Sequence, residues 1–237
     1  MRIRTILSDL DSTRDAREAL YRHFHRHPEL SLQEYATADR IEQELRASGI
    51  EEVLRIGRTG VVAILRNGGG PVVAMRGDTD GLPMAERSGV DYAAEGVTQV
   101  DEATGKETPV AHTCGHDFHI VCLLGATQAL HAHRDSWSGT FVAVFQPGEE
   151  NAAGAKAMVA AGIVDKVPRP DVYLGQHVLG SLPGGAVGIR SGPLFSAAAS
   201  IEITLYGKGS HGSMPNLGVD PIVLGAAIVT RLQTIVA

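Results

Sequence analysis

Thr140-Phe-Val-Ala-Val-Phe145 is the stretch that indicates the fold most directly. It contains no charged residue, and a continuous apolar run of this length is typical of a strand in the buried middle of a sheet. Shorter β-branched runs predict further strands at Glu52–Ile56, Val61–Leu65, Val72–Met75, Val172–Leu174 and Ala186–Ile189. Helical patterns lie before and between these runs. The alternation predicts an α/β fold with a central, mostly parallel sheet.

Four helices are expected in the same part of the chain. They run to His25, from Ser31 to Gly49, from His116 to His133, and from Ala152 to Ala161. Ser31 and Glu34 have the spacing of a capping box, in which both side chains satisfy backbone N–H groups at the helix start. The polar residues between Gly96 and Thr108 are expected to form a loop.

The pattern changes around Pro193. Ile201–Tyr206 alternates in hydropathy like a strand, and Pro221–Val236 has the pattern of a helix. We therefore expect two domains, one over residues 1–193 and one over residues 194–237.

Composition and charge narrow the class of protein. Of the 237 residues, 43% are hydrophobic and 20% are charged, an ordinary balance for a globular chain. The net charge of −6 argues against a nucleic-acid partner, because phosphate binding needs clustered lysine and arginine. No apolar stretch approaches the ~18 residues of a membrane helix, and no signal peptide is expected. A cytoplasmic location is therefore expected. Cys114 and Cys122 cannot build a disulfide framework.

The segment His112-Thr-Cys-Gly-His-Asp-Phe-His119 concentrates side chains that bind metals. Cys114 and His116 flank a glycine, which allows both to reach one ion, and thiolate and imidazole suit zinc and similar metals. Asp117 could orient an imidazole from behind. A lone histidine is usually structural, but this density of histidine, cysteine and aspartate indicates a metal site.

Two pairs of carboxylates follow predicted strands, where open α/β sheets form their sites. Asp78 and Asp80 are two residues apart and share a face in an extended chain, although turn aspartates are equally plausible. Glu149 and Glu150 follow the buried strand, so one could bind metal while the other moves protons. Taken alone, this second pair is more often a favourable charge at a helix start.

His177 also follows a predicted strand, Val172–Leu174. A lone histidine at such a place is more often a packing residue than a ligand. Its position beside the other strand ends favours the site.

Two other patterns resemble sites and are rejected. Gly207-Lys-Gly-Ser-His-Gly212 matches a dinucleotide-binding fingerprint, but Met214-Pro215 follows where a helix should continue. His23, His25 and His27 look like a metal cluster. The proline after His27 disfavours a helical conformation there, so packing or surface roles are expected for all three.

In this order, the segments resemble the M20 metallopeptidase family, and within it the aminoacylase-like branch of hippurate and auxin-conjugate hydrolases. The resemblance covers nearly the whole chain and is carried by Phe24-His-Arg-His-Pro-Glu-Leu-Ser31, Arg76-Gly-Asp-Thr-Asp-Gly-Leu-Pro83, His112-Thr-Cys-Gly-His-Asp117, Gln146-Pro-Gly-Glu-Glu150, Gly175-Gln-His-Val178 and Gly207-Lys-Gly-Ser-His-Gly-Ser-Met-Pro215. It implies a zinc-peptidase-like catalytic domain over residues 1–193. Residues 194–237 would be the first part of an inserted α+β, ferredoxin-like lid or dimerisation domain.

The resemblance also implies roles for single residues. The ligands of two divalent ions, which could be zinc, manganese, cobalt or nickel, are matched by Cys114, His116, Glu150 and His177. Glu149 matches the general base, and Asp80 matches the aspartate that orients a ligand histidine. His211 falls in the lid, where the matching histidine of similar homodimeric enzymes reaches the substrate in the other subunit.

Such an enzyme cleaves the amide bond of N-acetyl, N-benzoyl or similar N-acyl amino acids with metal-activated water, releasing a carboxylic acid and a free amino acid. The resemblance also places a last metal-binding histidine after the lid. An inactive truncated fragment or an interaction module is therefore the alternative expectation for a chain that ends at Ala237. A dipeptidase or aminopeptidase of the same family is the second alternative. Cys114 speaks against it, because peptidase branches tend to have aspartate there.

Overall fold

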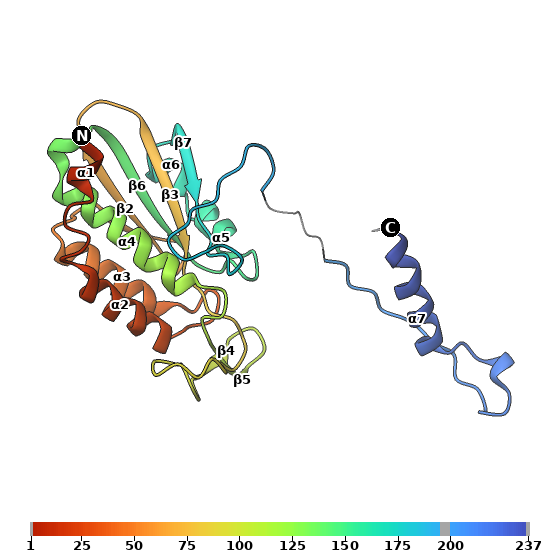
Figure 1. Cartoon of the computed structure of the whole chain (residues 1–237). Coiled ribbons are helices and arrows are strands. Elements are labelled where there is room, and N and C mark those ends of the chain that lie inside the picture. Colours follow the sequence, from red (N-terminus) through yellow and green to blue (C-terminus); the bar gives the residue numbers. More distant parts are fainter. Residues whose placement is uncertain (1, 195–199, 236–237) are drawn as a thin grey trace. The chain divides into compact units, whose positions relative to one another are not determined.

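The computed structural model describes residues 2–194 and 200–235 of the chain (Figure 1). Contacts between residues divide the chain into two compact units, Met1–Ser181 and Leu182–Ala237. The boundary predicted at residue 193 lies inside the second unit, and the assignment of a catalytic and a lid domain stays a prediction. No helix among the described residues is both long and apolar enough to cross a membrane.

The first unit contains the helices and strands that the sequence predicts, with slightly different ends. Its elements are α1 (Arg2–Ile6), α2 (Arg14–Arg26), α3 (Tyr35–Ala47), β1 (Val53–Ile56), β2 (Gly60–Asn67), β3 (Val72–Asp78), β4 (Thr98–Asp101), β5 (Lys106–Pro109), α4 (His116–Ala132), η1 (Arg134–Ser136), β6 (Gly139–Gln146), α5 (Gly154–Ala160), α6 (Ile163–Lys166) and β7 (Val172–Gly175). The α/β class is confirmed.

The main sheet has the strand order β1-β2-β6-β3-β7 and is mixed. Strand β3 pairs in parallel with β6 and β7, whereas β1–β2 and β2–β6 are antiparallel. The prediction of a mostly parallel sheet was therefore wrong for the β1–β2–β6 side. For β1 and β2 the reason is the short connection from Ile56 to Gly60, since so few residues can join only antiparallel neighbours.

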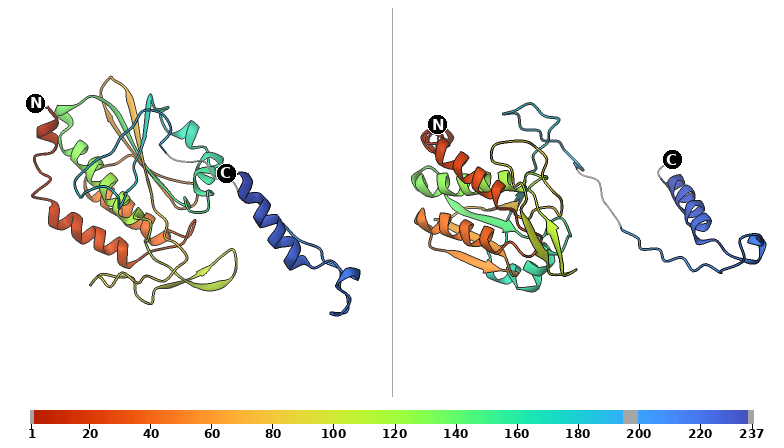
Figure 2. Two further views of the ribbon diagram at one scale, coloured as in Figure 1. Left: turned by 45° about the vertical axis from the view of Figure 1, so that its right-hand side comes forward. Right: turned by 90° about the horizontal axis from the view of Figure 1, so that it is seen from below.

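Strand β6 is buried on both faces, as its apolar sequence predicted. Phe141, Ala143 and Phe145 pack into a cluster with residues of α2, α3 and α4, whereas Val142 and Val144 pack into a second cluster with Met158 of α5. Figures 1 and 2 show the corresponding layers, with α2, α3 and α4 on one face of the sheet and α5 and α6 on the other. Because helices pack against both faces of the sheet, the strand ends that precede the polar motifs are held in place.

Helix α3 is capped by a residue that the sequence did not indicate. The carboxylate of Glu29 accepts hydrogen bonds from the backbone N–H groups of Ala36 (3.1 Å) and Thr37 (2.7 Å). The predicted capping box was wrong, because the side chains of Ser31 and Glu34 point to other partners. The carboxylate of Glu29, which precedes the helix, therefore caps it in place of Ser31.

The predicted loop from Gly96 to Thr108 forms the antiparallel hairpin β4–β5 instead. Its turn is closed by the N–H of Gly105, which donates to the carbonyl of Asp101 at 2.7 Å, and Gly105 has a φ of 68°. Glycine adopts this left-handed backbone at little cost. Polar side chains on both strands hid the hairpin from a prediction based on hydropathy.

The second unit contains η2 (Pro215–Leu217), α7 (Pro221–Leu232) and η3 (Gln233–Ile235). Asp220 caps α7, accepting from the N–H groups of Ile222 and Val223, so the predicted helix is confirmed over its described length. The strands predicted at Ala186–Ile189 and Ile201–Tyr206 do not form within the described residues. A strand needs a partner for its backbone groups, and none of the described elements of this unit supplies one.

Candidate metal centre

The carboxyl ends of three neighbouring strands meet at one edge of the main sheet. Asp78 at the end of β3 lies beside Gln146 at the end of β6, and Arg76 of β3 pairs with Gly175 at the end of β7. The motifs that follow these strands are therefore brought together, as predicted for an open α/β sheet.

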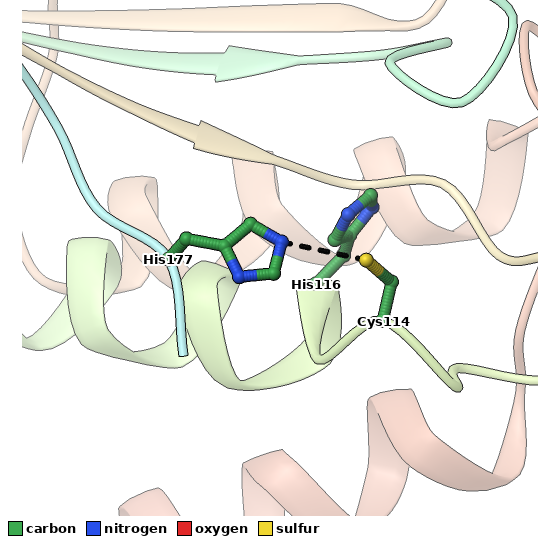
Figure 3. A group of neighbouring side chains, drawn as sticks. All are labelled: Cys114, His116 and His177. Atoms are coloured by element: carbon green, nitrogen blue, oxygen red, sulfur yellow. Dashed lines mark hydrogen bonds between the residues drawn. The ribbon is translucent and has the colours of Figure 1, made fainter. Parts of the chain in front are cut away.

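Three predicted ligands come together at this edge (Figure 3). The donor atoms of Cys114, His116 and His177 lie within 4.8 Å of one another. Cys114 precedes α4, His116 opens it, and His177 follows β7. Gly115 between the first two has a φ of 85°, and a Cβ there would lie 2.3 Å from a methyl carbon of Val178. Glycine is thus required for both side chains to face one point.

The hydrogen bonds of the two histidines leave one nitrogen of each facing the cluster. His177 Nδ1 lies 2.7 Å from the carbonyl oxygen of Val178, to which it can only donate, and its Nε2 lies 3.4 Å from Cys114 Sγ. His116 Nδ1 lies 3.2 Å from Asp80 Oδ1. His116 Nε2 is buried and has no hydrogen-bond partner among the residues that the structure describes. A metal ion is the partner that such a nitrogen lacks.

Both predicted glutamates also lie near His116. In the turn after β6, Glu150 Oε1 is 3.7 Å and Glu149 Oε2 is 3.9 Å from His116 Nε2. These three residues form a second group with metal-ligand spacing, and His116 belongs to both groups. The side chain of Glu149 is 40% exposed, which makes it accessible to substrate and solvent.

Asp80 connects three parts of the chain behind this cluster. Its Oδ1 faces His116 Nδ1, while its Oδ2 accepts hydrogen bonds from the hydroxyl of Ser31 (2.6 Å) and the backbone N–H of Glu150 (3.0 Å). Burial alone would raise the pKa of Asp80, but these hydrogen bonds outweigh burial and lower it. The ionised carboxylate holds the imidazole ring with Nε2 turned to the cluster.

Asp78 has a different set of partners from Asp80. Its Oδ1 accepts from His119 Nδ1 at 2.6 Å, and its Oδ2 forms an ion pair of 2.9 Å with Arg76. Burial opposes ionisation, but the hydrogen bond from His119 and the charges of His116 and Arg76 lower its pKa. The two aspartates thus support two different histidines.

The charges of the cluster favour a bound cation. Burial raises the pKa of the Cys114 thiol to about 12, and the negative charges of Glu150, Asp78 and Glu149 add to this effect. Burial also raises the pKa of Glu150. Acidic side chains that disfavour one another's ionisation are stabilised by a divalent ion, which deprotonates a coordinating thiol. The donor set therefore fits a divalent metal ion.

Two other predicted residues have partners outside this cluster. Asp117 does orient an imidazole, but it is that of His25, whose Nδ1 lies 2.6 Å from its carboxylate, while His25 Nε2 lies 2.9 Å from Glu86. His25 is thus a buried residue held between two carboxylates. His211 belongs to the second unit, where its Nδ1 pairs with the hydroxyl of Ser213 at 2.7 Å. Its role in catalysis stays a prediction.

The comparison with known protein families rests on the same segments. The chain matches the model of peptidase family M20/M25/M40 over residues 74–231, which includes every predicted site residue. The chain belongs to this family. The resemblance of its motifs to M20 enzymes is thereby confirmed.

Relatives of this M20 chain hydrolyse amides, according to their names. It is 37% identical to an N-acetyl-L-cysteine deacetylase of Bacillus subtilis, over 91% of the chain and 49% of the relative. It is 39% identical to an N-acyl-L-amino acid amidohydrolase of Geobacillus stearothermophilus, over 91% of the chain and 55% of the relative. The chain thus spans about half the length of the curated relatives it matches.

A solved M20 structure has the same fold. The YXEP protein of Bacillus subtilis, described as a dinuclear metal-binding peptidase, is 34% identical, with a TM-score of 0.67 over 78% of this chain and 48% of that one. Its description supports metal binding in the family.

A hollow of about 500 Å³ adjoins the candidate centre of this M20 chain. Cys114 and His177 form one part of its lining, and Tyr21, Phe118 and His112 contribute aromatic rings. Burial lowers the pKa of His112 to about 4, so this ring is neutral near pH 7. A hollow of this size can hold a small organic molecule beside the metal ligands.

Glu34 supports the loop that carries Glu149 and Glu150. Substitutions of Glu34 test this support. Its buried carboxylate accepts from the N–H of Gly148 (2.8 Å) and the hydroxyl of Thr59 (2.5 Å). Glu34→Ala leaves both donors without this acceptor, which should lower the free energy of unfolding by about 1–3 kcal/mol for each. Glu34→Gln keeps an acceptor for Gly148, and Thr59 can accept from the new amide.

The pH dependence of stability should distinguish Glu34 from its glutamine variant. Burial raises the pKa of Glu34 above its ordinary value of 4.5, so the folded chain holds this proton more tightly than the unfolded chain. The contribution of this raised pKa to the free energy of unfolding is complete below pH 4.5. It is lost as the pH rises through the pKa of Glu34 in the folded chain. Urea unfolding should therefore show the wild type losing stability relative to Glu34→Gln as the pH rises. A constant difference across this range would contradict the prediction.

Proposed function

We propose that this chain contains the metal-binding and proton-transferring part of an amidohydrolase that cleaves N-acyl amino acids. The observation that carries the proposal is the position of His116. Its buried, unpartnered Nε2 belongs to one donor group with Cys114 and His177 and to another with Glu149 and Glu150. Relatives that are named as a deacetylase and as an amidohydrolase of N-acyl amino acids support the substrate class.

Four side chains would hold the two divalent ions: Cys114, His116, Glu150 and His177. The mixed set of sulfur, nitrogen and oxygen donors suits zinc, manganese, cobalt or nickel. When bound, such ions supply a water with a lowered pKa and polarise the amide carbonyl. Asp80 keeps His116 in the tautomer and orientation that this ligand role needs.

Glu149 is proposed to move the proton. Its carboxylate is partly exposed beside His116, so it can take a proton from the attacking water on Oε2 and deliver it to the leaving amine. The guanidinium of Arg76 lies 3.9 Å from Glu149 Oε1, on the carboxylate oxygen that does not face His116.

The second unit is proposed to complete the active site in a homodimer. His211 would then stabilise the developing oxyanion in the other subunit, a kind of contact worth about 3–4 kcal/mol in other enzymes. The hollow lined by Tyr21 and Phe118 is a place for the acyl group or the amino-acid side chain. A location in the cytoplasm is proposed from the two unpaired cysteines.

The test is a substrate panel with the full product of the gene, since the chain spans about half the length of its relatives. Release of free amino acid is measured from N-acetyl, N-benzoyl and longer N-acyl amino acids with added zinc, manganese or cobalt. Unblocked dipeptides serve as the comparison. We expect the N-acyl substrates to be hydrolysed faster. Faster cleavage of dipeptides would support the peptidase alternative, and no hydrolysis by a metal-loaded protein would contradict the amidohydrolase proposal.

A further inference from the structure

His119 lies one turn after His116 on α4, and its side chain is 1% exposed. Its ring centroid is 4.8 Å from that of His177, at an interplanar angle of 68°. A buried histidine at the edge of a metal centre is either a further ligand or a support for one. Its hydrogen bonds decide between these roles.

Both ring nitrogens of His119 are already engaged within the chain. Nδ1 lies 2.6 Å from Asp78 Oδ1, and it carries the ring proton because Nε2 is the acceptor of a backbone N–H. Nε2 then has a free lone pair, which accepts the backbone N–H of Val178 at 2.9 Å. His119 could bind a metal only by giving up one of these bonds, although it lies within ligand distance of Asp78 and His116.

The segment that His119 holds is the one that carries His177. Strand β7 ends at Gly175, so the ladder of the sheet does not fix the residues after it. His119 contacts this segment on both sides of His177. Its Nε2 holds the N–H of Val178, and its backbone oxygen accepts from the side chain of Gln176 at 3.4 Å. His177 Nδ1 in turn lies 2.7 Å from the carbonyl oxygen of Val178.

We propose that His119 is a positioning residue for His177, acting through the connected series Asp78–His119–Val178. Asp78 fixes the tautomer of His119, His119 fixes the backbone of Val178, and that backbone fixes the ring of His177 with Nε2 toward Cys114. The pair Asp80–His116 in the same cluster shows a similar arrangement of a carboxylate behind a histidine. The inference rests on the proposed role of His177 as a metal ligand.

Two near-isosteric variants separate the two hydrogen bonds of His119. In His119→Gln the amide oxygen can replace Nε2 as acceptor for the Val178 N–H. In His119→Asn the amide N–H₂ can replace Nδ1 as donor to Asp78, but the acceptor for Val178 is lost. Leu124→Ala, which shortens another buried side chain of α4, controls for general loss of stability.

The first measurement is cobalt binding to the chain, followed by the thiolate-to-cobalt absorption of Cys114. We expect His119→Asn to lose about 10- to 100-fold in cobalt affinity, as typical for partners behind a ligand. His119→Gln should stay within a few-fold of the wild type. Leu124→Ala should bind like the wild type despite a lower Tm. Wild-type affinity in His119→Asn, or an equal loss in Leu124→Ala, would overturn the proposal.

The second measurement needs no metal. Amide exchange at Val178 should be faster by about tenfold or more in metal-free His119→Asn than in His119→Gln, because the N–H loses its acceptor. Equal exchange in both variants would show that His119 does not hold this segment. If the wild type gives no cobalt absorption, the proposed ligand set is wrong. The exchange result still decides whether His119 holds the segment around His177.

Discussion

Glu149→Gln should lower kcat by about 10²- to 10⁴-fold, the usual contribution of a general base. Glutamine has nearly the same shape but cannot take a proton. Glu149 is 40% exposed and lies 3.9 Å from both His116 Nε2 and Arg76. Its replacement should therefore leave the fold and the metal content unchanged. Steady-state kinetics with the best substrate of the panel, together with metal analysis of the same sample, measure both quantities.

The matched control for this variant is Glu51→Gln, which changes an exposed glutamate just before β1. It should retain the wild-type kcat. Near-normal turnover by metal-loaded Glu149→Gln would show that another group is the base. A loss of bound metal would instead indicate that Glu149 acts as a ligand.

Cys114→Ser and His116→Ala should each lower metal affinity by more than the roughly 10- to 100-fold typical of outer partners, because each removes a direct donor. The cobalt complex of Cys114→Ser should also lack the thiolate-to-metal absorption. Activity should fall with the metal content at limiting metal. Titration with cobalt, monitored by absorption and calorimetry, measures the affinity and the identity of the donor together.

Cys122→Ser is the matched control, since Cys122 is the other free cysteine and lies further along α4. It should keep both the affinity and the absorption band. If Cys114→Ser binds cobalt with the wild-type spectrum, the thiolate is not a ligand. If His116→Ala keeps its metal content, the position of the buried Nε2 has no bearing on metal binding.

Much of the first unit could be predicted from hydropathy alone, because its central strand is buried on both faces. The apolar run around Val142 and Val144 is explained by a strand whose two faces are both covered by packed side chains. The direction of neighbouring strands was harder to predict. Parallel and antiparallel strands bury the same side chains, so hydropathy does not distinguish them. In this chain the short connection before Gly60 determines that β1 and β2 are antiparallel.

The candidate site was predictable where its residues follow strands. Asp80, Glu150 and His177 come together because they follow the ends of the neighbouring strands β3, β6 and β7, whereas Cys114 and His116 lie at the start of α4. The supporting residues were not predictable in the same way. Ser31 and Glu34 fit a helix cap locally, yet their partners are Asp80 and Gly148, far along the chain. Local spacing cannot identify contacts that only the folded chain creates.

His119 and Arg76 were visible inside the motifs but had no assigned role. Their function depends on which oxygen of Asp78 each contacts, and the sequence does not contain that information. In the second unit, the helix Pro221–Leu232 was predictable because its cap and its bonds are local. Strands depend on distant partners, and the predictions for them failed there.

The three partners of Asp80 come from three segments that are distant in the sequence of the first unit: Ser31, His116 and Glu150. An isolated peptide with the Cys-Gly-His motif would contain the thiol and the imidazole without the carboxylate that aims the ring. The affinity of the centre is therefore a property of the whole unit rather than of its most recognisable motif. A bound ion would in turn stabilise the folded state, because the unfolded chain offers it no such arrangement. Metal binding at the proposed centre would therefore be coupled thermodynamically to folding of the unit.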